Sequence, residues 1–74
     1  MSALQPAYIV VVERKGCARL YLRDGGGLSL DCNDAIAVDQ RRVAEDCARR
    51  IHDAHVKEWA LPAERIKKVV EVSR

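Results

Sequence analysis

The sequence predicts a small α+β domain in which one helix packs on one face of a four-stranded, mainly antiparallel sheet. Three observations lead to this fold class: apolar residues alternate in short segments bounded by glycine turns, one longer segment has helical periodicity, and a valine-rich segment closes the chain. The element order is therefore β-β-β-α-β. A chain of 74 residues has room for one such domain, which we place at residues 7–74 after a short N-terminal leader at residues 1–6.

The first strand is predicted at residues 7–13, AYIVVVE. β-branched residues dominate this segment, and apolar side chains occupy both of its alternating sets of positions. A strand that is apolar on both sides is typical of the interior of a sheet. Ile9 and Val11 then share one face, and Val10 and Val12 share the other.

Each of the next two predicted strands follows a glycine turn. Gly16 suits a tight turn and precedes the alternating segment 17–24, CARLYLRD, so this segment and the first strand should form an antiparallel hairpin. Three glycines at 25–27 lead to a short third strand at 28–32, LSLDC. The glycine spacing matches neither phosphate-binding motif, so the run is interpreted as a turn. The side chains expected to pack beneath the helix are Ala18, Leu20, Leu22, Leu28 and Leu30.

The helical pattern runs from about Asp39 to about Lys57, and Asp39 suits the N-cap position. Arg41 and Arg42 fall in the first turn, where positive charge opposes the helix dipole. This placement hints at another use for the two arginines, although ion pairs with acidic residues one turn later explain it equally well. The apolar face of the helix comprises Val43, Ala44, Cys47, Ala48, Ile51 and His55.

The last predicted element is a strand at residues 63–73, after Pro62. The spacing of its apolar residues also suits a helical turn, so both structures stay open, but Val69, Val70 and Val72 favour a strand. A right-handed crossover through the helix would return this strand parallel to the first one, at the open edge of that strand. The spatial order of the strands is then 3-2-1-4.

Composition and charge exclude several classes of protein. The net charge of +2, from 13 basic and 11 acidic residues, is too small for a dedicated nucleic-acid coat protein and too positive for an acidic mimic of DNA. No apolar run is long enough to span a bilayer, and the first residues lack the pattern of a secretory signal, so we expect a cytoplasmic protein. Cys17, Cys32 and Cys47 form no CxxC pair and are expected to be reduced thiols within apolar patterns.

Three segments, YLRDGG, NDAIAVD and RRVAEDCARR, together resemble small proteins of bacteria, phages and mobile elements. In those proteins a Tyr-Leu strand meets a glycine turn, and an acidic-Ala step leads into an Ala-rich helix. The resemblance covers about residues 7–51, but Leu28 and Val38 stand where such proteins often carry tryptophan and phenylalanine. Some anti-CRISPR inhibitors are similar in size and layout, so the resemblance implies inhibition of a bacterial defence complex by direct binding.

Candidate catalytic and metal-binding groups are few. His52 and His55 stand three residues apart, whereas zinc-binding helices use a spacing of four with a glutamate between the histidines. Cys47 lies two helical turns before His55, too far for both to bind one ion. A cysteine nucleophile would also need a cleft, an orienting group and an oxyanion hole. We therefore expect neither an enzyme nor a metal or other cofactor.

An aromatic ring between two arginines marks the surface best suited to binding. If the helix covers one side of the sheet, then Arg19, Tyr21 and Arg23 lie on the other side, beside one set of first-strand side chains. An exposed apolar strip flanked by tyrosine and arginine has the composition of an interface hot spot. A structural explanation is equally good, because such side chains often lay their stems over valines. With the helix arginines, the expected partner-binding residues are Ile9, Val11, Arg19, Tyr21, Arg23, Arg41, Arg42 and Arg49.

The expected function is that of a non-enzymatic protein-binding module. Its partner would be a Cas or other defence protein, or a second copy of the chain in a homodimer. The alternative is a small single-stranded nucleic-acid-binding protein, in which Tyr21 stacks on a base while Arg19 and Arg23 contact phosphates. The two classes differ in a measurable property, because affinity for nucleic acid falls with salt, whereas a homodimer changes the mass in solution.

Overall fold

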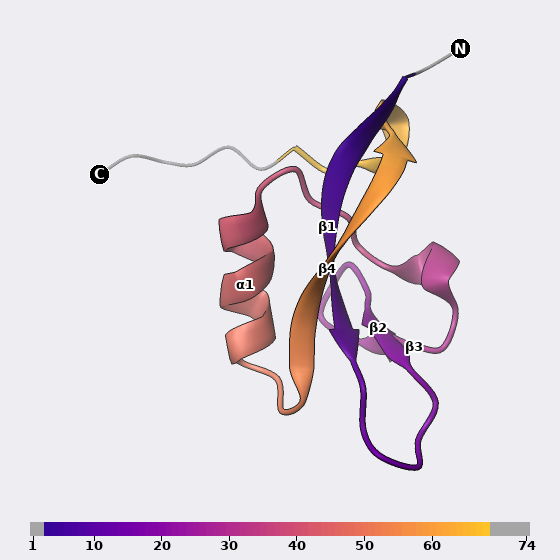
Figure 1. The fold of residues 1–74 in the computed structure, drawn as a ribbon, viewed down its shortest axis with the longest axis vertical. Coiled ribbons are helices and arrows are strands. Elements are labelled where there is room, and N and C mark those ends of the chain that lie inside the picture. Colours follow the sequence, from indigo (N-terminus) through magenta and orange to yellow (C-terminus); the bar gives the residue numbers. More distant parts are fainter. Residues whose placement is uncertain (1–2, 69–74) are drawn as a thin grey trace.

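The computed structural model describes residues 3–68, and Figure 1 shows its elements. The four strands form one sheet in the order β3-β2-β1-β4, and every neighbouring pair is antiparallel. The predicted α+β class and the predicted strand order are therefore confirmed. The elements are β1 (Leu4–Val12), β2 (Leu20–Leu22), β3 (Leu28–Ser29), α1 (Arg41–Arg49) and β4 (Ala54–Pro62), with short 3-10 turns η1 (Cys32–Asp34) and η2 (Ala63–Arg65).

The interior strand β1 makes most of the strand pairs in the sheet. It pairs with β4 along all nine of its residues, from Leu4 opposite Pro62 to Val12 opposite Ala54, and with the short β2 on its other side. This strand begins at Leu4, inside the segment predicted as a leader, because residues 4–6 find partners in the last three residues of β4. The two-sided apolar character of β1 thus indicated its interior position correctly.

The predicted helix was too long, and the predicted last strand was placed too late. The helix covers Arg41–Arg49, and residues 54–57 belong to β4. Asp53 adopts a φ of 62°, a left-handed conformation that Asp tolerates better than most residues and that reverses the chain direction after α1. The last strand therefore returns antiparallel to β1, not parallel to it. Residues 69–73 of the predicted strand lie outside the described residues.

The face of the sheet that α1 covers, called the helix face, holds the first part of the core. Val10 of β1, Leu22 of β2 and Val38 are buried there with Ala44 and Ala48 of α1. Alanine at both helix positions lets the α1 backbone approach the strands closely. Leu28 and Leu30 do not pack beneath the helix as predicted, since they are 38% and 68% exposed.

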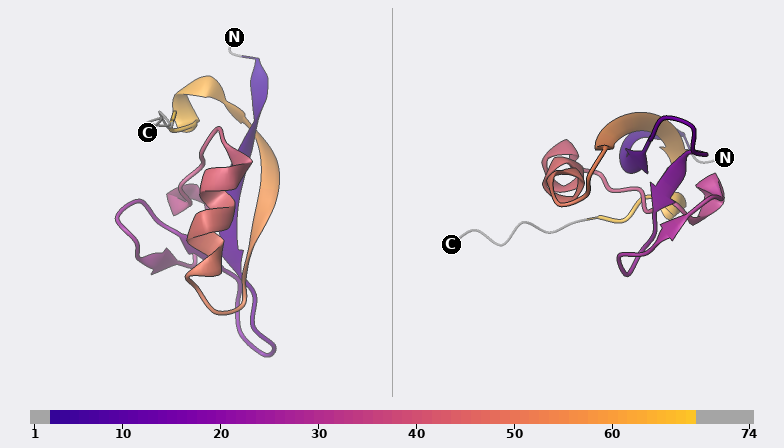
Figure 2. Two further views of the ribbon diagram at one scale, coloured as in Figure 1. Left: turned by 90° about the vertical axis from the view of Figure 1, so that its left-hand side faces the viewer. Right: turned by 90° about the horizontal axis from the view of Figure 1, so that it is seen from below.

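The other face of the sheet, called the opposite face, is covered as well, which corrects the expectation of a bare valine strip. Ile9 and Val11 are 1% and 0% exposed, so neither side chain is available to a partner. Tyr21, Trp59 and Ile66 pack over Ile9 and its neighbours, together with the segment 35–37. This cover arises because the chain passes η1 on the side of β1 away from α1 (Figure 2) and then returns along β1, where Tyr8 and Val38 form a bridge.

Candidate partner-binding site

The open edge of β4 is the candidate site, and the hydrogen bonds of β1 show how it is oriented. Tyr8 and Val38 exchange both backbone hydrogen bonds, at 2.9 Å and 3.0 Å. The backbone groups of Tyr8 therefore point toward Val38 and away from β4. Tyr8 lies opposite Glu58, so these two residues form one of the pairs in the β1–β4 ladder that exchange no hydrogen bonds.

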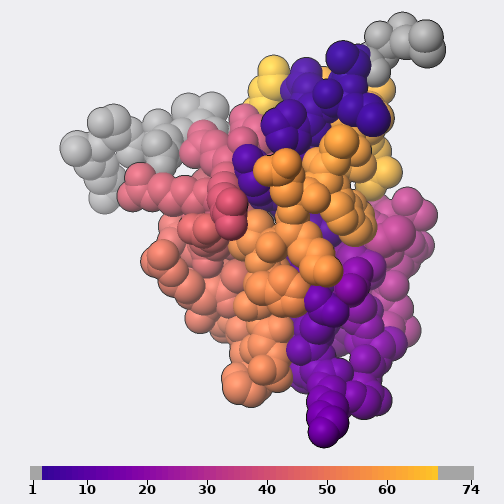
Figure 3. All heavy atoms as spheres, viewed as in Figure 1, coloured from indigo at the N-terminus to yellow at the C-terminus, as the bar shows by residue number. Residues whose placement is uncertain are grey.

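Alternation along the strand extends this assignment. Because Glu58 has no hydrogen-bonded partner in β1, its backbone N–H and C=O point outward, and so do those of Val56 and Ala60. Lys57 and Trp59 point their backbone groups inward, toward Ile9 and Ala7 of β1. In the described part of the chain, residues 3–68, no strand lies on the outer side of β4. Figure 3 shows the side chains of β4, in orange, at the surface between those of α1 and β1.

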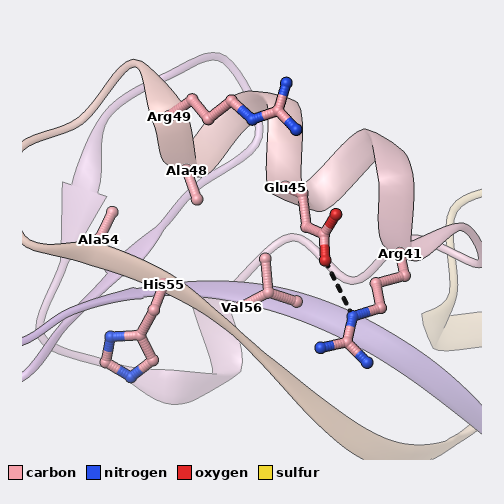
Figure 4. Close-up of a pocket in the computed structure, with 7 residues that line it drawn as sticks. All are labelled: Arg41, Glu45, Ala48, Arg49, Ala54, His55 and Val56. Atoms are coloured by element: carbon pink, nitrogen blue, oxygen red, sulfur yellow. Dashed lines mark hydrogen bonds and ion pairs between the residues drawn. The ribbon is translucent and has the colours of Figure 1, made fainter.

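A groove separates the beginning of this edge from α1. Its volume is about 380 Å³, and the two elements supply all seven lining residues. In Figure 4 the α1 residues stand above β4, Val56 rises between them, and His55 points to the other side of the strand. The groove is thus bounded by a helix on one side and by a strand edge on the other. The lining residues are Arg41, Glu45, Ala48, Arg49, Ala54, His55 and Val56.

Two of the three helix arginines predicted to bind a partner line this groove. Arg41 donates a hydrogen bond to Glu45 over 3.0 Å, and Arg49 donates one to Asp46 over 3.3 Å. Their side chains are 66% and 76% exposed, so solvent screens both ion pairs strongly. Both guanidinium groups therefore keep donors available to a partner. Arg42 is exposed but does not line the groove.

A second group of charged side chains gathers around Glu13 on the opposite face. Glu13 accepts a hydrogen bond from Arg19 over 3.1 Å, and its other oxygen lies 2.7 Å from His55 Nε2 and 3.6 Å from Lys57 Nζ. The hydrogen bond from Arg19 lowers the pKa of the Glu13 carboxyl, partial desolvation opposes this, and the nearby positive charges lower it further. One carboxylate thus holds three basic groups at the end of β1.

Tyr21 lies next to this group and contacts a second aromatic ring. The ring centroids of Tyr21 and Trp59 are 5.9 Å apart at an interplanar angle of 51°. A side-chain hydrogen bond with Tyr21 is the main cause that raises the pKa of Arg19, and the hydrogen bond to Glu13 adds to it. Tyr21 and Arg19 are therefore together, as predicted. Arg23 is not with them, because it lines a depression on the helix face.

That depression lies between α1 and the glycine turn of the β2–β3 hairpin. Its volume is about 350 Å³, and valine, leucine and isoleucine side chains make up most of its wall, together with Cys47. Arg23 and Lys67 are its charged lining residues, and Lys67 lies 3.5 Å from Asp24. The position of Arg23 separates it from the aromatic pair with which the sequence grouped it.

Sequence reasoning missed three residues of these surfaces, namely His55, Lys57 and Trp59. All three were assigned to the helix or to the segment just after it, whereas they belong to β4 and share its opposite face. The signal that could have found them is a period of two, since Val56 alternates with these side chains before Pro62 ends the strand.

Candidate metal ligands do not cluster in the described part of the chain. Within residues 3–68, no three His, Cys, Asp or Glu side chains come together as a metal site would need. His52 lies 3.4 Å from Asp53, and His55 bonds to Glu13, so the two histidines have separate carboxylate partners. In the same range, no helix has the length and apolar character that crossing a membrane requires.

Comparisons with known proteins add no functional assignment. A scan of protein-family models found no match, and searches of curated proteins and of solved structures found no significant match. The resemblance to phage and mobile-element proteins therefore stays a prediction.

Proposed function

We propose that this protein is a non-enzymatic binding module that takes an extended segment of another protein as an added strand on the edge of β4. The observation that carries this proposal is the outward direction of the backbone groups of Val56, Glu58 and Ala60. An extended peptide supplies the complementary donors and acceptors at the same spacing. The edge strand is nine residues long, which is ample for a peptide ligand.

The groove beside α1 supports the same function. An added strand would lie next to β4 with one set of side chains facing Arg41 and Arg49 and the other set beside His55 and Lys57. It would therefore contact a helix and a strand at once. Natural sheets protect exposed edges with charged residues, and Lys57 and Glu58 at the middle of β4 oppose uncontrolled pairing.

The partner we propose is a protein of a bacterial defence complex, such as a Cas protein, in the cytoplasm. The resemblance to small phage proteins supports this partner class. The described cysteines, Cys17, Cys32 and Cys47, are free thiols, and the first two are exposed, which suits a reducing compartment.

A backbone substitution tests the proposed mode of binding. Glu58→Pro removes an outward N–H without removing a hydrogen bond to β1, whereas Glu58→Ala keeps that N–H and removes the side chain. Random displayed peptides are selected on the wild-type protein, and the selected peptides are then measured with both variants. We expect Glu58→Pro to weaken binding by at least about tenfold, and Glu58→Ala to change it by less than about threefold.

Two results decide this test once circular dichroism has shown that both variants unfold at similar temperatures. Equal binding by wild type and Glu58→Pro would show that the β4 edge is not used. Failure to select any peptide would also count against strand addition, because the method requires no knowledge of the natural partner.

A second candidate function, binding of single-stranded nucleic acid, is favoured by one specific observation. Trp59 adds a second ring beside Tyr21, and Arg19, Lys57 and His55 lie on the same opposite face. Aromatic rings that stack on bases, with cations that contact phosphates, are the usual elements of such surfaces. Glu13 opposes this function, because its carboxylate occupies the cations that a phosphate would need.

The nucleic-acid candidate is tested by titrating a fluorescent single-stranded oligonucleotide at two salt concentrations. If this function is correct, Glu13→Gln should tighten binding, more strongly at low salt, and Trp59→Ala should weaken it at both salt concentrations. Binding that is absent at low salt, or that does not respond to either substitution, rejects the candidate.

A further inference from the structure

We propose that β4 selects its partner segment by charge: the segment places a basic residue opposite Glu58 and an acidic residue opposite Lys57. This inference rests on the proposed strand addition and adds the chemistry of the partner. Adjacent residues on a strand point to opposite faces, so the Glu58 side chain lies beside helix-face residues of the added strand and the Lys57 side chain lies beside its opposite-face residues. Each of the two charges therefore selects the charge of one partner residue, and these two partner residues are adjacent in sequence. Arg41 and Arg49 line the groove on the helix face, but each is paired with a carboxylate, Glu45 or Asp46, so they repel a basic partner residue less than unpaired arginines would.

Both side chains are accessible to such a partner. Glu58 is exposed and lies opposite Tyr8 on the helix face. The Lys57 side chain is 35% exposed, and its Nζ is 3.6 Å from a Glu13 oxygen, which is longer than a strong charge-assisted hydrogen bond. Lys57 thus keeps donors for a second carboxylate. Residues directly opposite each other in antiparallel strands are close enough for opposite charges to stabilise the pair.

The neighbours of the two charges define the rest of the partner segment. Val56 and Ala60 flank Glu58 on the helix face, so apolar residues of the partner should lie opposite them. Trp59 lies next to Lys57 on the opposite face and favours an aromatic or β-branched residue. For a segment that runs antiparallel to β4, the order from its N-terminal end is apolar, aromatic, basic, acidic, apolar.

The same charges argue against a second copy of this chain as the occupant. Two β4 strands related by a two-fold axis pair antiparallel, and the axis passes through the middle of the paired segment. An axis at Glu58 places Glu58 opposite Glu58, and an axis at Lys57 places Lys57 opposite Lys57. Both registers put like charges directly opposite each other, which is destabilising. An axis at Trp59 instead pairs Glu58 with Ala60 and Lys57 with Leu61, so none of these three registers forms a pair of opposite charges. The partner that fits is a foreign protein segment with the reverse charge order.

Two synthetic peptides test the selection. One contains Val-Tyr-Lys-Glu-Val between threonines, and the other contains Val-Tyr-Glu-Lys-Val in the same context, so that length, composition and net charge are identical. Wild-type protein should bind the first peptide about three- to tenfold more tightly. A double variant, Lys57→Glu with Glu58→Lys, should reverse that preference. Because the double variant brings another carboxylate close to Glu13, the single variant Glu58→Lys is measured as well and should at least abolish the preference.

Amide NMR spectra of the 74-residue chain separate failure of this inference from failure of the proposed function. If both peptides bind equally and shift the amides of Val56, Glu58 and Ala60, strand addition stands and charge selection is wrong. If neither peptide binds or shifts these amides, both proposals are overturned. A concentration-dependent dimer that shifts the same amides without peptide would overturn the choice of a foreign segment.

Discussion

Glu13 Oε1 lies 2.7 Å from His55 Nε2, and this contact ties the loop after β1 to the beginning of β4. The same carboxylate also accepts a hydrogen bond from Arg19, which follows the next turn. Three separate segments therefore meet at one side chain. The interaction is at the surface, where the Glu13 side chain remains 39% exposed. Its contribution consequently depends on solvent conditions, above all on pH.

Acid should weaken this contact in a defined direction. The pKa of Glu13 is lowered from 4.5 in the folded protein, chiefly by the hydrogen bond from Arg19. The folded state thus holds the proton less tightly than the unfolded state. The stabilisation is fully present above pH 4.5 and is lost as the pH falls through the lower folded pKa. Thermal unfolding at mildly acidic and strongly acidic pH should show a smaller decrease in Tm for Glu13→Gln than for wild type.

Glu64→Gln is the matched control, because it removes a carboxylate outside this contact. If acidification lowers the Tm of Glu13→Gln and of wild type by the same amount, the contact around Glu13 makes no protonation-dependent contribution to stability.

Hydrogen exchange should alternate along β4. The amides of Lys57 and Trp59 point toward β1 and should exchange slowly, whereas those of Val56, Glu58 and Ala60 point outward and should exchange at least about tenfold faster. Amide exchange followed by NMR resolves each position. Slow exchange at the three outward amides of the free protein would mean that the edge is already paired.

Ile9 should contribute strongly to stability, although the sequence suggested that it contacts a partner. Its side chain is 1% exposed beneath Tyr21 and Trp59. Ile9→Ala should lower the free energy of unfolding by about 2–4 kcal/mol in urea denaturation. Leu30→Ala, at a side chain that is 68% exposed, should change it by less than about 0.5 kcal/mol. If both variants lost a similar free energy of unfolding, this result would contradict the burial of Ile9 on the opposite face.

The stability of the protein should depend on which residue occupies position 53, in the turn between α1 and β4. Asp53 has a φ of 62°, which asparagine also tolerates and which β-branched residues disfavour strongly. The free energy of unfolding of Asp53→Asn should lie within about 0.5 kcal/mol of the wild-type value. That of Asp53→Val should be lower than wild type by about 1–2 kcal/mol. Asp53→Asn also removes the charge near Arg14 and His52, so it controls for the loss of those ion pairs. Equal stability of the two variants would show that this backbone conformation carries no cost.

Much of the fold could be predicted from local pattern. Apolar residues on both sides of 7–13 indicated an interior strand, and the turns at Gly16 and at 25–27 placed the β2–β3 region. These signals are strong because they depend on neighbours in the sequence, which dictate turn geometry and side-chain alternation directly. The strand order was predicted from a right-handed crossover to a parallel last strand. The order is correct although β4 is antiparallel, because a last strand of either direction can pair with the open edge of β1.

The boundary between α1 and β4 could not be predicted in the same way. Residues 54–57 continue the apolar spacing of a helix, with Ala54 and His55 three and four residues after Ile51. What decides their structure is the unpaired edge of β1, whose backbone groups β4 satisfies over nine residues. That edge is far away in the sequence, so a local pattern does not contain it. The same error moved Lys57 and Trp59 out of the candidate surface.

The interior position of β1 also governs how the chain can mature. During synthesis this valine-rich strand leaves the ribosome before β4, which closes its longer side. Until then a stretch with high aggregation propensity is without its main partner. Translation speed between β1 and β4, and chaperones that shield nascent apolar strands, should therefore influence the yield of this protein.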